Sequence, residues 1–586
     1  MARAAAIQPI LLPLNGIDMA RFCALLVLLL LTRLAQAELE VSVEPRNDAA
    51  KRNIEAYIGP ITADSRRAMW RQARASREQA LNALQALGYY HARVRPRVTG
   101  SETEPVLQLN VVLQEPVLLG EVTLEVTGEG SDEEFFNLSR SRHLMPGAQL
   151  HHGHYEDTKS LLENQALRYG YFSGEFLENR MLIDVEQRLA DIILRYETGP
   201  RFHLGAVSFS DTPFDEDLLQ RMVPFAPGVP YDADLVAELN RELLASGYFD
   251  AVQVSAPASQ AVDHEIPVEV ALSARKKHSL GFGGGFSTDV GPRARAEWTQ
   301  HWLNSRGHSR GAETELAGPR QKVTSWYQIP LTPPQSSHLR FFTGWQRETI
   351  DDTDSQSMVL GGLYQKRLES GWDRSIGLRL EHERFSLGND SGKSTLLIPS
   401  LGFQRTISDD TMDPSRGYSL LMDLQGAKAG VLSDIDFVRL NVAARGLYTW
   451  RDSHRFLARV QAGGIASDGF SSVPPSLRFF AGGDQSVRGY DYRTLSPTDE
   501  TGDRIGGRYL LASSIEYQYE FRPKWRAATF VDHGNAVNSW KAPMKTSAGI
   551  GIRWVSPVGP IRLDLARSIS DQDEGFRIHF SMGAEL

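Results

Sequence analysis

Two short stretches of the sequence carry residue types that could do chemistry. His151-His152-Gly153-His154 offers three imidazoles, which are common metal ligands. A zinc site needs further ligands, and no cysteine or carboxylate pattern nearby completes one, so we interpret this stretch as a solvated loop where a helix starts. Gly281-Phe282-Gly283-Gly284-Gly285 is glycine-rich, but a phosphate cradle needs a helix behind it, and none is expected there. We therefore expect no metal, no cofactor and no enzymatic activity.

A third stretch combines charge with apolar residues. The segment from about Ala466 to Gly507 contains Arg478-Phe479-Phe480-Ala481-Gly482-Gly483-Asp484-Gln485-Ser486-Val487-Arg488-Gly489-Tyr490. It is too long and too apolar for an idle surface loop. We therefore expect this segment to carry function and ask which elements position it.

The N-terminus has the pattern of an export signal. Arg21 precedes the apolar stretch from Ala24 to Leu31, and Ala35-Gln36-Ala37 then supplies small residues for cleavage. This predicts a signal peptide over residues 1–37 and a mature chain that starts at Glu38.

Composition narrows the class of protein further. Met19 is an alternative translation start. The single cysteine, Cys23, leaves with the signal peptide, which excludes a disulfide framework in the exported chain. The net charge of −9 comes from well-mixed acidic and basic residues, so nucleic acid is not an expected partner. After Leu31 no run of apolar residues is long enough for a spanning helix.

The first half of the chain repeats one local pattern. Leu84–Tyr90, Gln165–Phe172 and Arg241–Phe249 each read as a helix that ends at a glycine, followed by aromatic residues and a strand, and the glycines are 82 and 77 residues apart. This predicts three small α+β domains. Their expected ranges are 38–115, 116–199 and 200–274.

The second half, residues 275–586, alternates apolar and polar residues between turns. Ile515, Tyr517, Tyr519 and Phe521 alternate with Ser514, Glu516, Gln518 and Glu520. A soluble sandwich could alternate in the same way, but a helix-free strand region of this length fits a closed membrane barrel better. We predict a membrane β-barrel of about 16 antiparallel strands, at roughly 19 residues per strand and turn.

Four motifs resemble one family. Val487-Arg488-Gly489-Tyr490, Asp413-Pro414-Ser415-Arg416-Gly417, Phe530-Val531-Asp532-His533-Gly534 and Val558–Asp564 look like the loop, turn and strand signatures of the outer-membrane assembly-factor superfamily. Barrels of that superfamily follow periplasmic POTRA domains. Three POTRA-like repeats resemble the TamA family, whereas the central insertase carries five and two-partner secretion transporters carry two. The final residues, Phe580–Leu586, lack the terminal aromatic of most such barrels.

The resemblance implies how the internal segment works. Its loop would fold back into the barrel lumen, where Arg488, with Gly489 and Tyr490, would lock the loop to the inner wall. Asp532 is the first expected partner of Arg488 and Glu516 the second, because a guanidinium in a narrow lumen needs a carboxylate within bidentate reach. A role in gating and a purely structural pin remain alternatives.

We place function at the seam where the first and last strands meet. The first strand carries four glycines and the last strand follows another, which would make this seam the weakest. The seam glycines are Gly281, Gly283, Gly284, Gly285 and Gly575. A parted seam exposes a strand edge that can pair with a client strand. The alternative is that these glycines only permit tight curvature.

The resemblance also implies an activity and partners. The protein would insert or translocate autotransporters and other unfolded β-barrel clients at the outer membrane, together with a TamB-like inner-membrane-anchored protein and membrane lipid. Three rival functions remain: a secretion transporter for one dedicated partner, a passive channel and a barrel-bound enzyme. The three-domain arm disfavours the channel, and no Ser/His or Asp/His site supports the enzyme.

Overall fold

The computed structural model describes residues 38–582, except 64, 103, 139–142, 351, 389, 557–558 and 572–574. The expected signal peptide over 1–37 and the last four residues of the tail therefore lie outside the described residues. Two compact units make up the chain. The first comprises residues up to Leu204 together with Gly228–Ala233 and Ala261–Ile266, and the second comprises the remainder.

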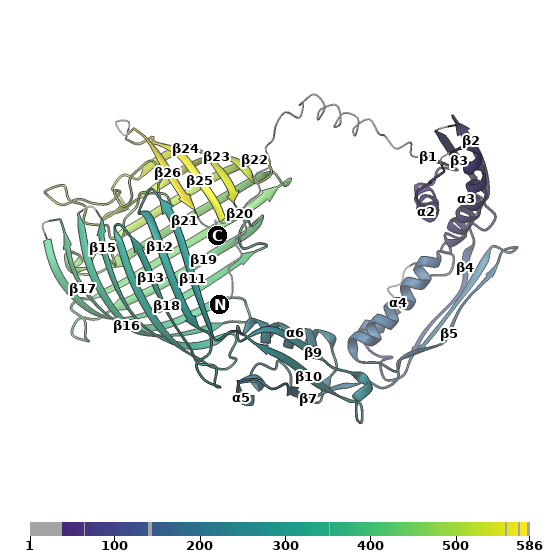
Figure 1. The fold of residues 1–586 in the computed structure, drawn as a ribbon, viewed down its shortest axis with the longest axis horizontal. Coiled ribbons are helices and arrows are strands. Elements are labelled where there is room, and N and C mark those ends of the chain that lie inside the picture. The colour runs from purple at the N-terminus through teal and green to yellow at the C-terminus, as the bar shows by residue number, and fades with distance from the viewer. Residues whose placement is uncertain are drawn as a thin grey trace, which may run out of the picture. The chain divides into compact units, whose positions relative to one another are not determined.

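The N-terminal part contains two small α+β units (Figure 1). In the first, strands in the order β1-β3-β2 pack against two helices, with the elements β1 (Glu38–Glu44), α2 (Asp48–Ile58), α3 (Arg66–Ala86), β2 (Arg93–Gly100) and β3 (Pro105–Val112). In the second, the strand order is β4-β6-β5, with the elements β4 (Leu118–Thr127), η1 (Glu134–Phe136), α4 (His152–Tyr169), β5 (Glu175–Asp184) and β6 (Leu189–Glu197).

A third unit of strands and helices precedes the large sheet. Its strands follow the order β8-β7-β10-β9. Its elements are β7 (His203–Phe209), α5 (Glu216–Gln220), β8 (Val229–Pro230), α6 (Ala233–Ala245), β9 (Phe249–Ser255), η3 (Ala258–Gln260) and β10 (Glu265–Ala274).

The three helix-ending glycines have the backbone that the repeat predicts. Gly88, Gly170 and Gly247 follow α3, α4 and α6 with φ of 84°, 86° and 75°. Residues with a Cβ rarely adopt this left-handed conformation, so glycine is the natural residue past the last turn. The predicted pattern of three small α+β units is confirmed.

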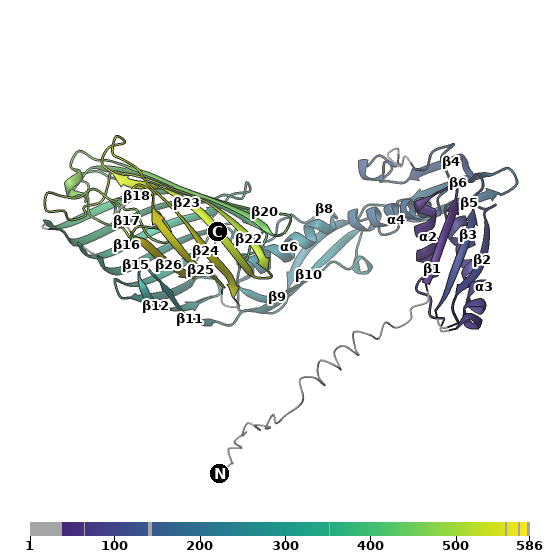
Figure 2. The same cartoon turned by 90° about the horizontal axis from the view of Figure 1, so that it is seen from above.

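The C-terminal part is a sheet of 16 strands, each antiparallel to the next (Figure 2). The strands are β11 (His278–Ser287), β12 (Gly291–Gln300), β13 (Ser309–Ala317), β14 (Arg320–Pro330), β15 (Ser337–Ile350), β16 (Thr353–Arg367), β17 (Asp373–Leu387), β18 (Asp390–Ser408), β19 (Arg416–Ala427), β20 (Phe437–Trp450), β21 (His454–Ala466), β22 (Tyr509–Arg522), β23 (Trp525–Val537), β24 (Lys545–Ser556), β25 (Gly559–Ser568) and β26 (Phe576–Met582). The predicted barrel of about 16 strands is confirmed.

Alternation along each strand separates the two faces of the barrel. Ile515 is 71% exposed and Val531 is 50% exposed, whereas Gln518 and Asp532 are fully buried. The exposed face is therefore apolar and the inner face is polar, as in a barrel surrounded by lipid. None of the described helices is long and apolar enough to cross a membrane.

The segment between β21 and β22 packs inside the barrel. It includes the short helix η4 (Phe470–Ser472). Its apolar side chains join a buried cluster with residues of the strands, among them Leu396, Phe437, Val473, Leu477, Phe479, Val487 and Tyr490. We call residues 467–508 the internal loop.

As far as the structure describes the chain, the first and last strands of the barrel meet at a seam without a strand ladder. Within the described residues the ladder runs from β11 to β26 and does not join these two strands to each other. The contacts across the seam are few. The Thr288 backbone N–H donates to the Phe580 carbonyl at 3.1 Å, and the Arg293 guanidinium donates to the Met582 carbonyl at 3.4 Å.

Candidate functional site

Arg488 of the internal loop uses all five of its guanidinium N–H groups. Its Nε and Nη2 donate to the two oxygens of Asp532 at 2.8 and 2.9 Å, which is a bidentate pair. Nη1 donates to Glu516 at 2.7 Å and to Asp564 at 3.1 Å, and Nη2 also donates to Ser514 at 3.1 Å. The guanidinium carbon lies 3.3 Å from the centroid of the Phe530 ring. This satisfies every donor of the side chain.

The strands present these acceptors because every second residue faces inward. Ser514 and Glu516 lie on β22, and in the ladder Ser514 pairs with Asp532 and Glu516 pairs with Phe530 on β23. Asp564 lies on β25. This part of the loop therefore docks on the continuous wall β22–β25, and we call this set of contacts the wall cluster.

The wall cluster is close to electrically balanced. Arg553 of β24 donates to Glu516 at 3.0 Å and to Asp564 at 2.6 Å. Arg459 of β21 lies 3.6 Å from Asp532. Three arginines thus face three carboxylates in a buried space, where an unpaired charge would cost several kcal/mol, of the order of 3–5 when one partner is removed.

The two residues after Arg488 extend the lock. Gly489 has φ of 89°, and a Cβ there would lie 3.2 Å from the backbone of Arg567 and from the side chain of Ser547. The Tyr490 hydroxyl contacts Ser568 at 2.5 Å and donates to Asp571 at 2.8 Å. Gly489 therefore combines a left-handed backbone with a close approach to the wall.

Sequence reasoning found only part of this site. The structure brings Arg488 together with Asp532 and Glu516, the two expected partners, whereas a role in gating stays a prediction. Sequence reasoning missed Asp564, Arg553 and Ser514 as members of the site. The polar alternation of their strands marked them as inward-facing, but alternation cannot tell which inward residues meet the loop.

The predicted turn at Asp413 has its own ion pairs. Asp413 accepts from Arg455 at 2.8 Å and from Arg526 at 2.9 and 2.7 Å. These contacts join the turn between β18 and β19 to the starts of β21 and β23. The Asp-Pro-x-Arg-Gly motif is thus a fixed corner of the barrel.

The seam glycines have room around them. A Cβ added at Gly281, Gly283 or Gly284 would meet a single atom at 3.8–4.0 Å, which is ordinary contact, and at Gly575 it would meet nothing within 4 Å. Gly285 is tighter, at 3.0 Å from the flexible Arg293 side chain. Close packing therefore does not require glycine at the first three positions.

The histidine stretch lies at the start of a helix. α4 begins at His152, and the ring of His154 stacks on that of His151 with centroids 4.2 Å apart. The expected helix start is confirmed, whereas the expected full solvation is wrong, because the three imidazoles are partly buried. The N-cap, His151, makes no side-chain cap hydrogen bond, so the usual sequence signal for a helix start is missing. Burial, then the neighbouring His151, lowers the pKa of both His152 and His154.

Family profiles match both halves of the chain. The profile described as "Omp85 superfamily domain" matches residues 280–586. The one described as "POTRA domain TamA domain 1" matches 40–113, and "Surface antigen variable number repeat", a POTRA profile, matches 202–273.

Known relatives agree with these profiles. The outer membrane protein assembly factor BamA of Nitratidesulfovibrio vulgaris is 25% identical over 457 residues, 72% of this chain and 56% of that protein. BamA of Neorickettsia risticii is 23% identical over 65% of this chain and 54% of its own length. The chain thus spans about half the length of these two relatives. The crystal structure of Haemophilus ducreyi BamA lacking POTRA domains 1–3 has the same fold, with a TM-score of 0.66 at 18% identity over 80% of this chain and 99% of that chain.

Proposed function

Because the chain belongs to the Omp85 superfamily, we propose that it is an assembly factor that inserts or translocates outer-membrane proteins. Its barrel lies in the outer membrane and its POTRA domains lie in the periplasm. The curated relatives are named as assembly factors, which supports this class of activity. We propose no catalytic step, because the client's own strand pairing and burial drive its insertion.

The observation that carries the proposal is the seam without a ladder. Neighbouring strands along the rest of the sheet are hydrogen-bonded to each other, whereas β11 and β26 share only the few contacts around Thr288 and Phe580 within the described residues. Backbone hydrogen bonds that a strand edge does not make with its neighbour can be made with another strand. The edge of β11 or β26 would therefore template the incoming strand of a client.

We further propose which clients and which partner the protein serves. The match of residues 40–113 to a TamA POTRA profile supports autotransporters and other β-barrel proteins as clients. It also supports a TamB-like inner-membrane-anchored protein as the partner of the arm. The exposed edges of the small sheets, β2 and β5, offer backbone groups for strand addition by either.

A disulfide across the seam tests the gate. Thr288 and Phe580 exchange hydrogen bonds at 3.1 Å, so their backbones are close enough for a cysteine pair, and the chain's own cysteine, Cys23, precedes the expected mature start. We expect oxidised T288C/F580C to abolish the surface protease accessibility of an autotransporter, and a reductant to restore it. The reduced protein controls for the loss of the Thr288 hydroxyl.

A second cysteine pair controls for cross-linking itself. Leu360 and Leu380 face each other in the continuous ladder of β16 and β17. We expect oxidised L360C/L380C to assemble clients normally. Normal client assembly by oxidised T288C/F580C would rule out the gate. Loss of one secreted protein alone would favour a dedicated secretion transporter. Cross-linking from the arm should capture a large inner-membrane-anchored protein.

A further inference from the structure

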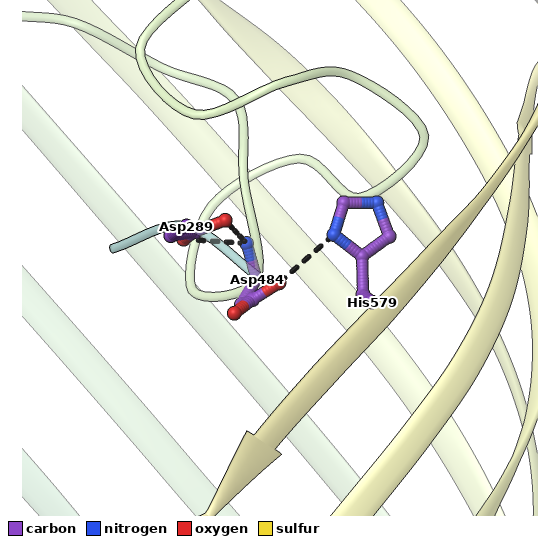
Figure 3. Close-up of side chains that lie close together, drawn as sticks. All are labelled: Asp289, Asp484 and His579. Carbon is purple, nitrogen blue, oxygen red and sulfur yellow. Dashed lines mark hydrogen bonds and ion pairs between the residues drawn. The ribbon is translucent and has the colours of Figure 1, made fainter. Parts of the chain in front are cut away.

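A second cluster, with two buried members and one partly buried member, joins three separate parts of the barrel beside the seam (Figure 3). Asp289 lies in the turn after β11, Asp484 lies in the internal loop and His579 lies on β26. One ligand atom from each residue lies within 4.8 Å of the others. The Asp484 backbone N–H donates to both oxygens of Asp289, at 3.1 and 2.9 Å. We call these three residues the seam cluster.

The Asp484 carboxylate is only half satisfied. Its Oδ1 accepts from the Thr288 hydroxyl at 2.7 Å and from His579 Nδ1 at 2.9 Å. Its Oδ2 is buried and has no hydrogen-bond partner, although the side chain is only 3% exposed. A buried carboxylate oxygen without a partner is costly, so Oδ2 of Asp484 is able to accept a proton or a cation.

His579 does not supply a positive charge. The Gly489 backbone N–H donates to its Nε2 at 2.8 Å, so Nε2 must be unprotonated. Nδ1 then carries the hydrogen and donates it to Asp484, and the ring is neutral. The same hydrogen excludes Nδ1 as a metal ligand, because a metal needs the lone pair of that nitrogen.

The two carboxylates therefore face each other without a cationic side chain. Within the described residues no lysine or arginine forms an ion pair with Asp289 or Asp484. Like charges at this distance need either a proton or a bound cation between them.

We propose that Asp289 and Asp484 bind one divalent cation of the calcium and magnesium class at the seam. The available ligands are carboxylate oxygens, which hard cations prefer over nitrogen or sulfur. His579 is a positioning residue, which holds Oδ1 of Asp484 and leaves Oδ2 free for the cation. The bound cation joins the turn after the first strand, the internal loop and the last strand. Only its effect on client assembly rests on the proposed function.

Calorimetry on the full-length protein tests the site directly. The protein is purified in detergent, stripped with EDTA and titrated separately with CaCl2 and MgCl2. We expect one cation per chain and at least a tenfold loss of affinity in D484N and in D289N. H579F should also weaken binding, and H579Q should restore part of it, because a glutamine amide can still donate to Asp484.

An acidic pair elsewhere in the same loop provides the matched control. Asp499 and Asp503 are linked through Thr501 in an exposed turn, and D499N should leave binding unchanged. Heat-modified mobility on gels reports that each variant contains a folded barrel. The proposal is overturned if the wild type binds neither cation, or if D484N binds the cation as tightly as the wild type. It is also overturned if acid alone, without a cation, stabilises the barrel. Because no client is present in calorimetry, these outcomes are independent of the experiment with oxidised T288C/F580C.

Discussion

The wall of β22–β25 and the seam between β11 and β26 are joined in opposite ways. On the wall, continuous ladders are overlaid by the buried wall cluster, in which Arg488 alone makes five side-chain hydrogen bonds. At the seam, a few contacts around Thr288 and Phe580 replace the ladder within the described residues. The barrel thus holds the Arg488 part of its internal loop on a side with continuous ladders, whereas the described seam has none.

Glycine has a different meaning in each region. On the wall, a Cβ at Gly551 would lie 1.9 Å from an Asp564 oxygen and 2.7 Å from the Leu563 carbonyl, so only glycine fits. In the first strand, a Cβ at Gly283 would meet a single atom at 4.0 Å, so this glycine contributes conformational freedom instead of fit. Room for a Cβ agrees with the flexibility explanation of the seam glycines, and the curvature explanation stays the alternative.

The largest expected effect comes from removing the centre of the wall cluster. R488A leaves Asp532, Glu516 and Asp564 without their shared guanidinium, which should destabilise the barrel by about 3–5 kcal/mol. R488K keeps the charge but loses the fork, so its effect should be smaller. Urea unfolding followed by tryptophan fluorescence measures both.

An exposed arginine that is not part of the wall cluster provides the control. Arg384 of β17 is exposed, and R384A should change the unfolding free energy by less than about 0.5 kcal/mol. If R488A were as stable as R384A, the wall would not be the rigid side of the barrel.

The second-largest effect tests whether close packing requires glycine at position 551 of the wall. G551A forces a methyl group against Asp564 and the backbone of β25 and should cost about 1–3 kcal/mol in the same unfolding assay. It should also loosen the internal loop, which protease sensitivity near Arg488 would report. Unchanged stability would mean that the wall can shift to admit a Cβ.

The matched change at the seam should act in the opposite direction. G283A restricts the unfolded chain without a clash and should stabilise the barrel by about 0.4–1 kcal/mol. If flexibility of β11 serves the gate, client assembly should slow despite the gain in stability, as measured by the rate at which an autotransporter becomes surface accessible. Faster or unchanged assembly would restore the curvature explanation.

The smallest effect lies in the second α+β unit, outside the barrel. The folded pKa of His154 is lowered by burial and by His151 and His143, so the unfolded chain binds more protons below about pH 6.5. The stability contribution is complete above that pH and is lost as the pH falls towards the folded value. Protease sensitivity of this unit should therefore rise modestly between pH 7 and 5.

H154Q removes one of these titrations and should flatten the pH response of the unit. The protease sensitivity of the wall and the seam should not change in H154Q, because His154 lies in the N-terminal compact unit. A parallel change in the barrel would indicate that the response has another origin.

The sequence by itself determined the features that depend on local pattern. The helix-ending glycines, exemplified by Gly170, repeat because a left-handed residue must follow each helix, and residues such as Ile515 and Glu516 alternate because a strand has a period of two. Arg488 with Asp532 also followed from sequence, through motif resemblance and the shared inward face of Phe530 and Asp532.

Only the tertiary structure decided the features that need the barrel to close. Asp564 and Arg553 are ordinary inward residues until strand register brings Asp564 to Arg488 and Arg553 to Glu516. Asp289 and Asp484, 195 residues apart, meet because the turn after the first strand and the internal loop converge at the seam. The glycines of the first strand had predicted a weak seam, but whether β11 and β26 pair was decided by closure of the whole ring, and within the described residues they form no ladder.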